Sequence, residues 1–139
     1  MIRVLVVDDS PTTRQAIVAM LETDPEIQVI GQACDGLEAV ALAAGLKPDV
    51  ITMDIHMPNM DGYDATRQIM RMNPTPIVVV TSVSQQELVH RGLDILLAGA
   101  LEIVQKPSGL NGSGMQVIRS ELVTKVRAVA QVRVRASSQ

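Results

Sequence analysis

The chain has 139 residues, 47% of them hydrophobic and 19% charged, with a formal net charge of −3, which is typical of one globular domain and excludes a largely disordered chain. No apolar run approaches the roughly 18 residues that cross a bilayer, and a chain with a single aromatic residue is a poor candidate for a base-stacking nucleic-acid module. Its one cysteine, Cys34, excludes an internal disulfide and is expected to be a small buried side chain. We therefore expect a cytoplasmic protein that contacts no membrane and makes no direct contact with nucleic acid.

Five short apolar segments rich in Val and Ile predict β-strands. They cover residues 3–7, 27–33, 50–53, 77–80 and 101–104. Their hydrophobicity is almost continuous rather than alternating, which is typical of strands that are covered on both faces.

Amphipathic segments between these runs predict helices. Ser10 followed by Pro11 is typical of an N-cap with proline at the first helical position. A third helix is expected over residues 63–71, and residues 84–87 form a capping-box pattern that opens a fourth. The buried face of the second helix is predicted from a spacing of i, i+3, i+4 and i+7 to be Leu37, Val40, Ala41 and Ala44. The apolar stripe of the last helix is Met115, Ile118, Leu122, Val126 and Val129.

This alternation of strands and helices predicts an α/β fold, a doubly wound parallel sheet with right-handed crossovers and helices on both faces. In such sheets the functional site lies beyond the carboxyl ends of the strands. Asp8 and Asp9 follow the first strand, Asp54 follows the third, Thr81 follows the fourth, and Lys106 follows the fifth. We expect these three carboxylates, the hydroxyl and the ammonium to converge on one edge of the sheet.

The combination of residue types at this edge fits phosphoryl transfer. Neighbouring carboxylates raise one another's pKa unless a cation joins them. A hard divalent ion such as Mg²⁺ takes oxygen ligands, usually one or two carboxylates with waters and a phosphoryl oxygen. A carboxylate can also attack phosphorus and form an aspartyl phosphate. Lys106 could then neutralise the phosphoryl oxygens and Thr81 could donate a hydrogen bond to them.

Motifs at these positions closely resemble those of bacterial response-regulator receiver domains, over roughly residues 1–127. They are Val-Val-Asp-Asp-Ser at 6–10, Asp-Ile-His-Met-Pro-Asn-Met-Asp-Gly at 54–62, Val-Thr-Ser at 80–82, Ala-Gly-Ala at 98–100 and Lys-Pro at 106–107. The resemblance implies the flavodoxin-like receiver fold, a five-stranded parallel sheet in the order 2-1-3-4-5.

The resemblance also implies a role for each site residue. Asp54 would accept a phosphoryl group from a phosphohistidine on a sensor histidine kinase. Asp9 and the backbone carbonyl of His56 would bind Mg²⁺ together with Asp54, while Asp8 would act through water. The imidazole of His56 is expected to face solvent. The switch hydroxyl and the phosphoryl-contacting ammonium would be those of Thr81 and Lys106.

A narrower resemblance is to the regulatory half of the chemotaxis protein-glutamate methylesterase. It rests on Ser10 after the acid pair, on residues 71–82, and on the Lys-Pro pair followed by a long loop. In that enzyme a linker joins the receiver to a catalytic domain with a Ser-His-Asp triad, whereas this chain has no G-x-S-x-G motif. We expect a receiver over residues 1–127, a helix end and linker over residues 128–139, and a C-terminal effector domain outside this chain.

Other outputs remain open at this point. The chain could be a free-standing receiver that binds a motor or a kinase, or the receiver of a DNA-binding regulator. A flavin-binding protein of the same fold is disfavoured, because Asp8 and Asp9 would repel a phosphate after the first strand. The chain also departs from most receivers at Ile103, where they carry Phe or Tyr, so the movement of a ring cannot be the output signal.

Overall fold

The computed structural model describes residues 1–82, 85–106, 112–132 and 134, in which strands and helices alternate along the chain. The strands are β1 (Ile2–Val7), β2 (Ile27–Ala33), β3 (Val50–Met53), β4 (Ile77–Thr81) and β5 (Glu102–Gln105). The helices are α1 (Pro11–Leu21), α2 (Gly36–Leu46), α3 (Gly62–Met72), α4 (Gln85–Ala98) and α5 (Gly112–Val129).

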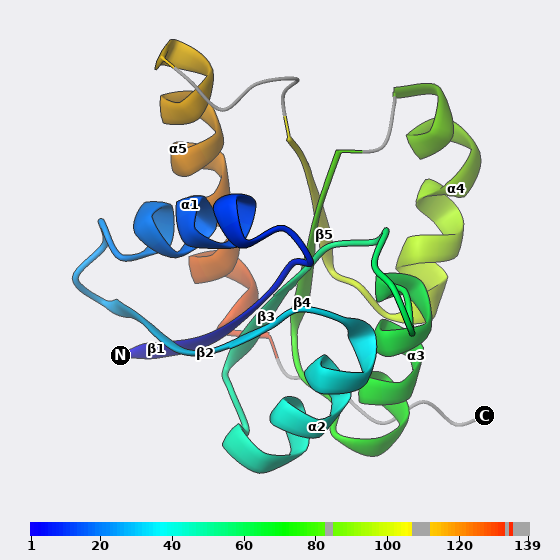
Figure 1. Ribbon diagram of the computed structural model, residues 1–139. Coiled ribbons are helices and arrows are strands. Elements are labelled where there is room, and N and C mark those ends of the chain that lie inside the picture. Colours follow the sequence, from blue (N-terminus) through cyan, green and yellow to red (C-terminus); the bar gives the residue numbers. More distant parts are fainter. Residues whose placement is uncertain (83–84, 107–111, 133, 135–139) are drawn as a thin grey trace.

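The strands form one parallel sheet in the order β2-β1-β3-β4-β5. Helices α1 and α5 cover one face of the sheet, and α2, α3 and α4 cover the other (Figure 1). The fold class and the strand order predicted from the sequence are confirmed. The order reverses direction between β1 and β3, so the carboxyl ends of these two strands meet where a ligand is expected.

Alternate residues of the central strands fill two separate cores. In β1, Val4 and Val6 pack toward α1 and α5, while Leu5 and Val7 pack toward α2 and α3. All four are at most 1% exposed. Burial on both faces explains why β1, β3 and β4 are almost continuously hydrophobic, whereas the edge strands β2 and β5 are partly exposed.

Side-chain caps start the first three helices at the edge of the sheet where the site was predicted. Ser10 Oγ accepts a hydrogen bond from the Thr13 N–H at 3.3 Å, with Pro11 in the first turn, as expected. Asp35 and Asp61 cap α2 and α3 in the same way, each accepting from the N–H three residues later at 2.8 Å. Ser84, the expected first residue of the capping box before α4, lies outside the described residues.

The buried face of α2 differs from the prediction. Leu37, expected in the core, is 54% exposed, and Ala41 and Ala44 are also exposed. The sequence of α2 is apolar around almost its whole circumference, so its periodicity does not select one side. The fully buried residues of α2 are instead Gly36, Ala39 and Ala43, all small enough to let this face of the helix approach the sheet closely. Of the four predicted residues, Val40 packs partly buried against the core.

Smaller differences concern single residues. Strand β1 begins one residue earlier than predicted, at Ile2, and β4 extends one residue further, to Thr81. Strand β5 is shifted by one residue and runs from Glu102 to Gln105. Cys34 is exposed, not buried, because it lies just beyond the end of β2. There its backbone N–H donates to the Glu38 carboxylate at 2.8 Å.

After α5, Ala130, Val132 and Val134 lie beside the residues that precede β3 and β4, at the amino-terminal edge of the sheet (Figure 1). Val134 packs against the core on the α2 and α3 side, although the preceding helix packs on the other side. Within the described part of the chain, no helix has the length and apolar content needed to cross a bilayer.

Candidate functional site

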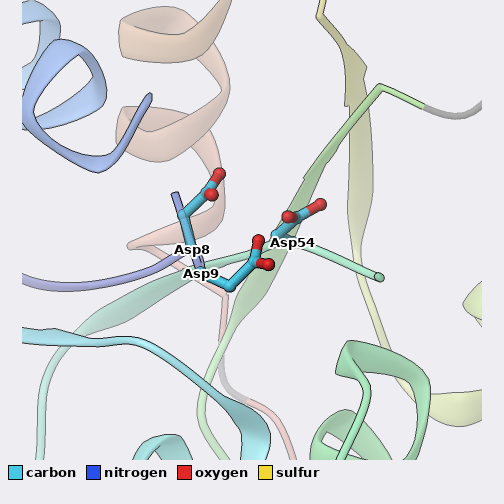
Figure 2. A group of neighbouring side chains, drawn as sticks. All are labelled: Asp8, Asp9 and Asp54. Carbon is cyan, nitrogen blue, oxygen red and sulfur yellow. The ribbon is translucent and has the colours of Figure 1, made fainter. Parts of the chain in front are cut away.

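Three carboxylates gather at the carboxyl ends of β1 and β3 (Figure 2). The Asp8 N–H donates to the Ala33 carbonyl and the Asp54 N–H donates to the Val7 carbonyl, both at 3.0 Å, so the sheet itself fixes these two backbones. One oxygen from each of Asp8, Asp9 and Asp54 lies within 4.8 Å of the others. Asp8 is 1% exposed and Asp54 is 7% exposed, whereas Asp9 is open to solvent.

An ammonium group lies among these carboxylates. Lys106 Nζ is 3.0 Å from Asp8 Oδ2 and 3.9 Å from Asp54 Oδ1, and its side chain is largely buried. The Lys106 N–H donates to the carbonyl of Thr81 at 2.8 Å, which joins the ends of β4 and β5. Thr81 is the last residue of β4 and is fully buried at the same edge.

The electrostatics of the site oppose a charged Asp54. The pKa of the Asp54 carboxyl is raised from its usual 3.8 to about 6, and burial is the largest cause. The Lys106 ammonium acts in the opposite direction, and so does the Ile55 N–H, which donates to Asp54 Oδ1 at 2.8 Å. The neighbouring Asp8 and Asp9 carboxylates act in the same direction as burial. One ammonium therefore does not offset the burial of Asp54 beside two other acids.

The donor set fits a hard divalent cation. All three groups are carboxylates, and oxygen is the donor that Mg²⁺ and Ca²⁺ prefer. Asp54, whose ionised form is disfavoured, would gain from a second positive charge. The exposure of Asp9 leaves a path for a hydrated ion to enter.

The loop that follows Asp54 is closed tightly beneath it. The Gly62 N–H donates to the Ile55 carbonyl at 2.8 Å. A Cβ on Gly62 would lie 1.8 Å from the Asp54 carbonyl oxygen, so only glycine fits this approach. The imidazole of His56 is 58% exposed, as expected, and its Nε2 lies 3.5 Å from Glu87 Oε1 at the start of α4.

Sequence reasoning did not identify Arg14 as part of the site. Arg14 lies in the second turn of α1 and donates through Nη1 to the Asp8 carbonyl at 2.7 Å. Its Nε donates to Gln32 Oε1, at the end of β2, at 3.1 Å. Helical side chains tilt toward the amino terminus of their helix. The side chain of an arginine one turn after the start of a helix that begins at the site can therefore reach back to the site, and this is the signal that would have identified Arg14.

Comparison with known proteins identifies the family. The family model described as "Response regulator receiver domain" matches residues 4–112. A protein-glutamate methylesterase/protein-glutamine glutaminase of Anaeromyxobacter dehalogenans is 51% identical over 132 residues, which are 95% of this chain and 38% of the relative. The chain thus spans about two fifths of the length of the curated relatives it matches.

Solved structures agree with this assignment. The response regulator domain of Thermotoga maritima CheB is 40% identical with a TM-score of 0.87, and the match covers 96% of this chain and 98% of that domain. The receiver domain of a Pseudomonas aeruginosa sensor histidine kinase, solved with magnesium in its active site cleft, is 29% identical with a TM-score of 0.75, covering 94% of this chain and 98% of the other. The chain therefore belongs to the response regulator receiver domain family.

Proposed function

We propose that this receiver domain accepts a phosphoryl group on Asp54 from a phosphohistidine of a sensor histidine kinase. The single observation that supports this assignment is the buried Asp54 carboxylate beside the Lys106 ammonium and two further acids. In the transfer, the P–N bond of the phosphohistidine breaks as a P–O bond to an Asp54 oxygen forms. The released imidazole nitrogen takes up a proton from solvent.

The other side chains of the edge act on the transferred group. Lys106, held by Asp8 at 3.0 Å, would neutralise charge on the phosphoryl oxygens, and Thr81 would donate a hydroxyl hydrogen bond to one of them. Mg²⁺ bound by Asp9, Asp54 and the His56 carbonyl, with Asp8 acting through water, would screen the acids from the incoming phosphate. The cluster of three carboxylates and the magnesium in the cleft of the Pseudomonas aeruginosa receiver both support this ligand assignment.

Incubation with acetyl phosphate and Mg²⁺ tests the acceptor residue. Wild type is expected to gain one phosphoryl group, stable to acid but released by hydroxylamine, as measured by intact mass. Asp54→Asn keeps the size of the side chain but replaces one carboxylate oxygen with an amide nitrogen and so removes the nucleophile. This variant should gain none. Equal labelling of the Asn variant would assign the acceptor to another residue.

We further propose that the domain regulates a protein-glutamate methylesterase in a chemotaxis pathway. The support is the similarity to methylesterases at 40–51% identity together with the coverage of only about two fifths of their length. Phosphorylation of Asp54 would then switch an effector domain attached after the receiver.

An immunoblot of the native host with an antibody against this chain tests the context. Because the chain covers 38% of its relatives, we expect a protein of more than twice its 14.9 kDa. In that protein, acetyl phosphate should accelerate methanol release from methylated receptors, and Asp54→Asn should abolish the acceleration. A native protein of 14.9 kDa would instead favour a free-standing receiver.

A further inference from the structure

The Arg14 side chain links the β1–α1 connection to β2 through two hydrogen bonds. Its guanidinium donates to the Asp8 carbonyl at 2.7 Å and to Gln32 Oε1 at 3.1 Å. The two bonds use different nitrogens of one planar group, so they fix its orientation as well as its distance. The residue itself is half-buried and does not belong to the acid cluster.

The carbonyl that Arg14 holds belongs to the peptide group that joins Asp8 to Asp9. The other polar groups of Asp8 are held separately. Its N–H donates to the Ala33 carbonyl at 3.0 Å, its Oδ1 accepts from the Ser10 N–H at 2.9 Å, and its Oδ2 accepts from Lys106. Asp8 is therefore fixed on every side, and the plane of the next peptide is set by Arg14.

Asp9 depends on that plane. The residue is exposed, so close packing does not determine the direction of its side chain. Rotation about the Cα–C bond of Asp8 would swing this peptide, displace the Asp9 Cα and turn its carboxylate away from Asp54. We propose that Arg14 is a positioning residue that orients Asp9 toward a divalent cation, an inference that rests on the proposed metal-dependent phosphorylation.

Charge and geometry predict opposite effects for the loss of this arginine. A guanidinium bonded to the Asp8 carbonyl would repel a metal cation held by Asp9 and Asp54, so by Coulomb's law alone its removal would strengthen Mg²⁺ binding. Loss of the bond to the Asp8 carbonyl would weaken binding, because outer-shell partners that orient ligands change metal affinity by roughly tenfold or more when removed. The sign of the change in affinity therefore separates positioning from simple electrostatics.

The test is a Mg²⁺ titration followed by the amide NMR signals of Asp9 and Ile55 in wild type and Arg14→Met, which keeps the apolar stem. We expect the dissociation constant to rise about tenfold in the variant. The matched control is Arg127→Met, which also removes one guanidinium and its 2.8 Å bond, here to Asp24 at the α1–β2 turn. The control should retain the wild-type affinity.

Two outcomes would overturn the inference. One is an Arg14→Met affinity equal to that of Arg127→Met, and the other is an affinity tighter than wild type. If Arg14→Met does not fold in urea-unfolding experiments, Gln32→Leu takes its place, because it frees the Nε end of the guanidinium and should weaken binding in the same direction. Failure of wild type to show any saturable Mg²⁺ response would contradict the proposed metal site itself and is distinguishable from both.

Discussion

The Asp54 carboxylate has a higher free energy when ionised in the folded protein than in water. Its pKa of about 6 lies above the usual 3.8, so between these values the folded protein retains a proton that the unfolded chain has released. By linkage, stability falls as the pH rises through this window. At pH 7 the ionised group therefore destabilises the metal-free domain, by about 1.4 kcal/mol for each unit of pKa shift.

Replacement of Asp54 by Asn should remove this pH dependence. In EDTA, the stability of Asp54→Asn relative to wild type is expected to increase by about 1–3 kcal/mol between pH 4 and pH 8. Urea unfolding at both pH values measures it. Saturating Mg²⁺ should diminish the difference at pH 8, because the cation stabilises the ionised form. A difference that stays constant with pH would show that burial does not disfavour the charged carboxylate.

The acids and the lysine of this site could be predicted from sequence because each directly follows an apolar strand. In a parallel sheet the carboxyl ends of the strands lie at one edge, so this position alone predicts that Asp8, Asp9, Asp54 and Lys106 lie together. Arg14 could not be predicted in this way. It acts on a backbone carbonyl, and the pattern of side chains along a sequence does not show where carbonyl groups point.

The β3–α3 loop and α2 show two opposite roles of glycine. Gly62 lies where a Cβ would come within 1.8 Å of a backbone oxygen of Asp54. Gly45, in the last turns of α2, has open space around the position of a Cβ. The first is required by a close approach next to the site, whereas the second only weakens a helix.

Alanine substitutions at these two glycines should therefore have effects of opposite sign. Gly62→Ala is expected to destabilise the domain by about 3 kcal/mol, since the clash is with backbone that cannot rotate away. Gly45→Ala should stabilise it by about 0.5–1 kcal/mol, because alanine loses less conformational entropy in a helix. Urea unfolding of both variants is the measurement. Equal effects at the two positions would contradict the close approach at Gly62.

At the level of elements, strand positions were easier to predict than helix faces. Strands buried on both sides give continuous apolar runs, and these define their limits to within a residue. The face of α2 could not be predicted, because nearly every residue of that helix is small or apolar. Small residues lie on both faces of α2, so the buried face is determined by how the helix docks on the sheet and not by its own sequence pattern.

The whole molecule has its candidate site at one edge of the sheet and the end of its described chain at the other. Below the amino-terminal edge, the chain after α5 lines a groove of about 330 Å³ together with the α2–β3 and α3–β4 connections. The lining residues are Pro48, Asp49, Pro74, Thr75, Pro76, Ala130, Val132 and Val134. The boundary expected at residue 127 stays a prediction, and the contribution of this segment to stability tests it.

Substitution of Val134 tests how far the folded unit extends. Val134→Ser should destabilise the domain by about 1 kcal/mol, because Val134 packs against the core. Val117→Ser provides the matched control, since Val117 is 68% exposed and the same substitution there should change stability by less than about 0.5 kcal/mol. Thermal unfolding compares the two. Equal stability of both variants would place the end of the folded unit before Val134.

The point where a following domain would be attached and the proposed phosphorylation site lie at opposite edges of the sheet. A domain tethered beyond Val134 would be anchored at the edge of the sheet opposite Asp54, about 13 Å away along the four residues of β3 alone. A phosphoryl group on Asp54 cannot pull on such a tether directly, because the rigid strands lie between them. It could influence a partner domain only through a face of the receiver that the partner touches. Lengthening the linker after Val134 should therefore leave the response of the partner domain to phosphorylation intact. Substitutions on the face of the receiver that contacts the partner domain should abolish this response.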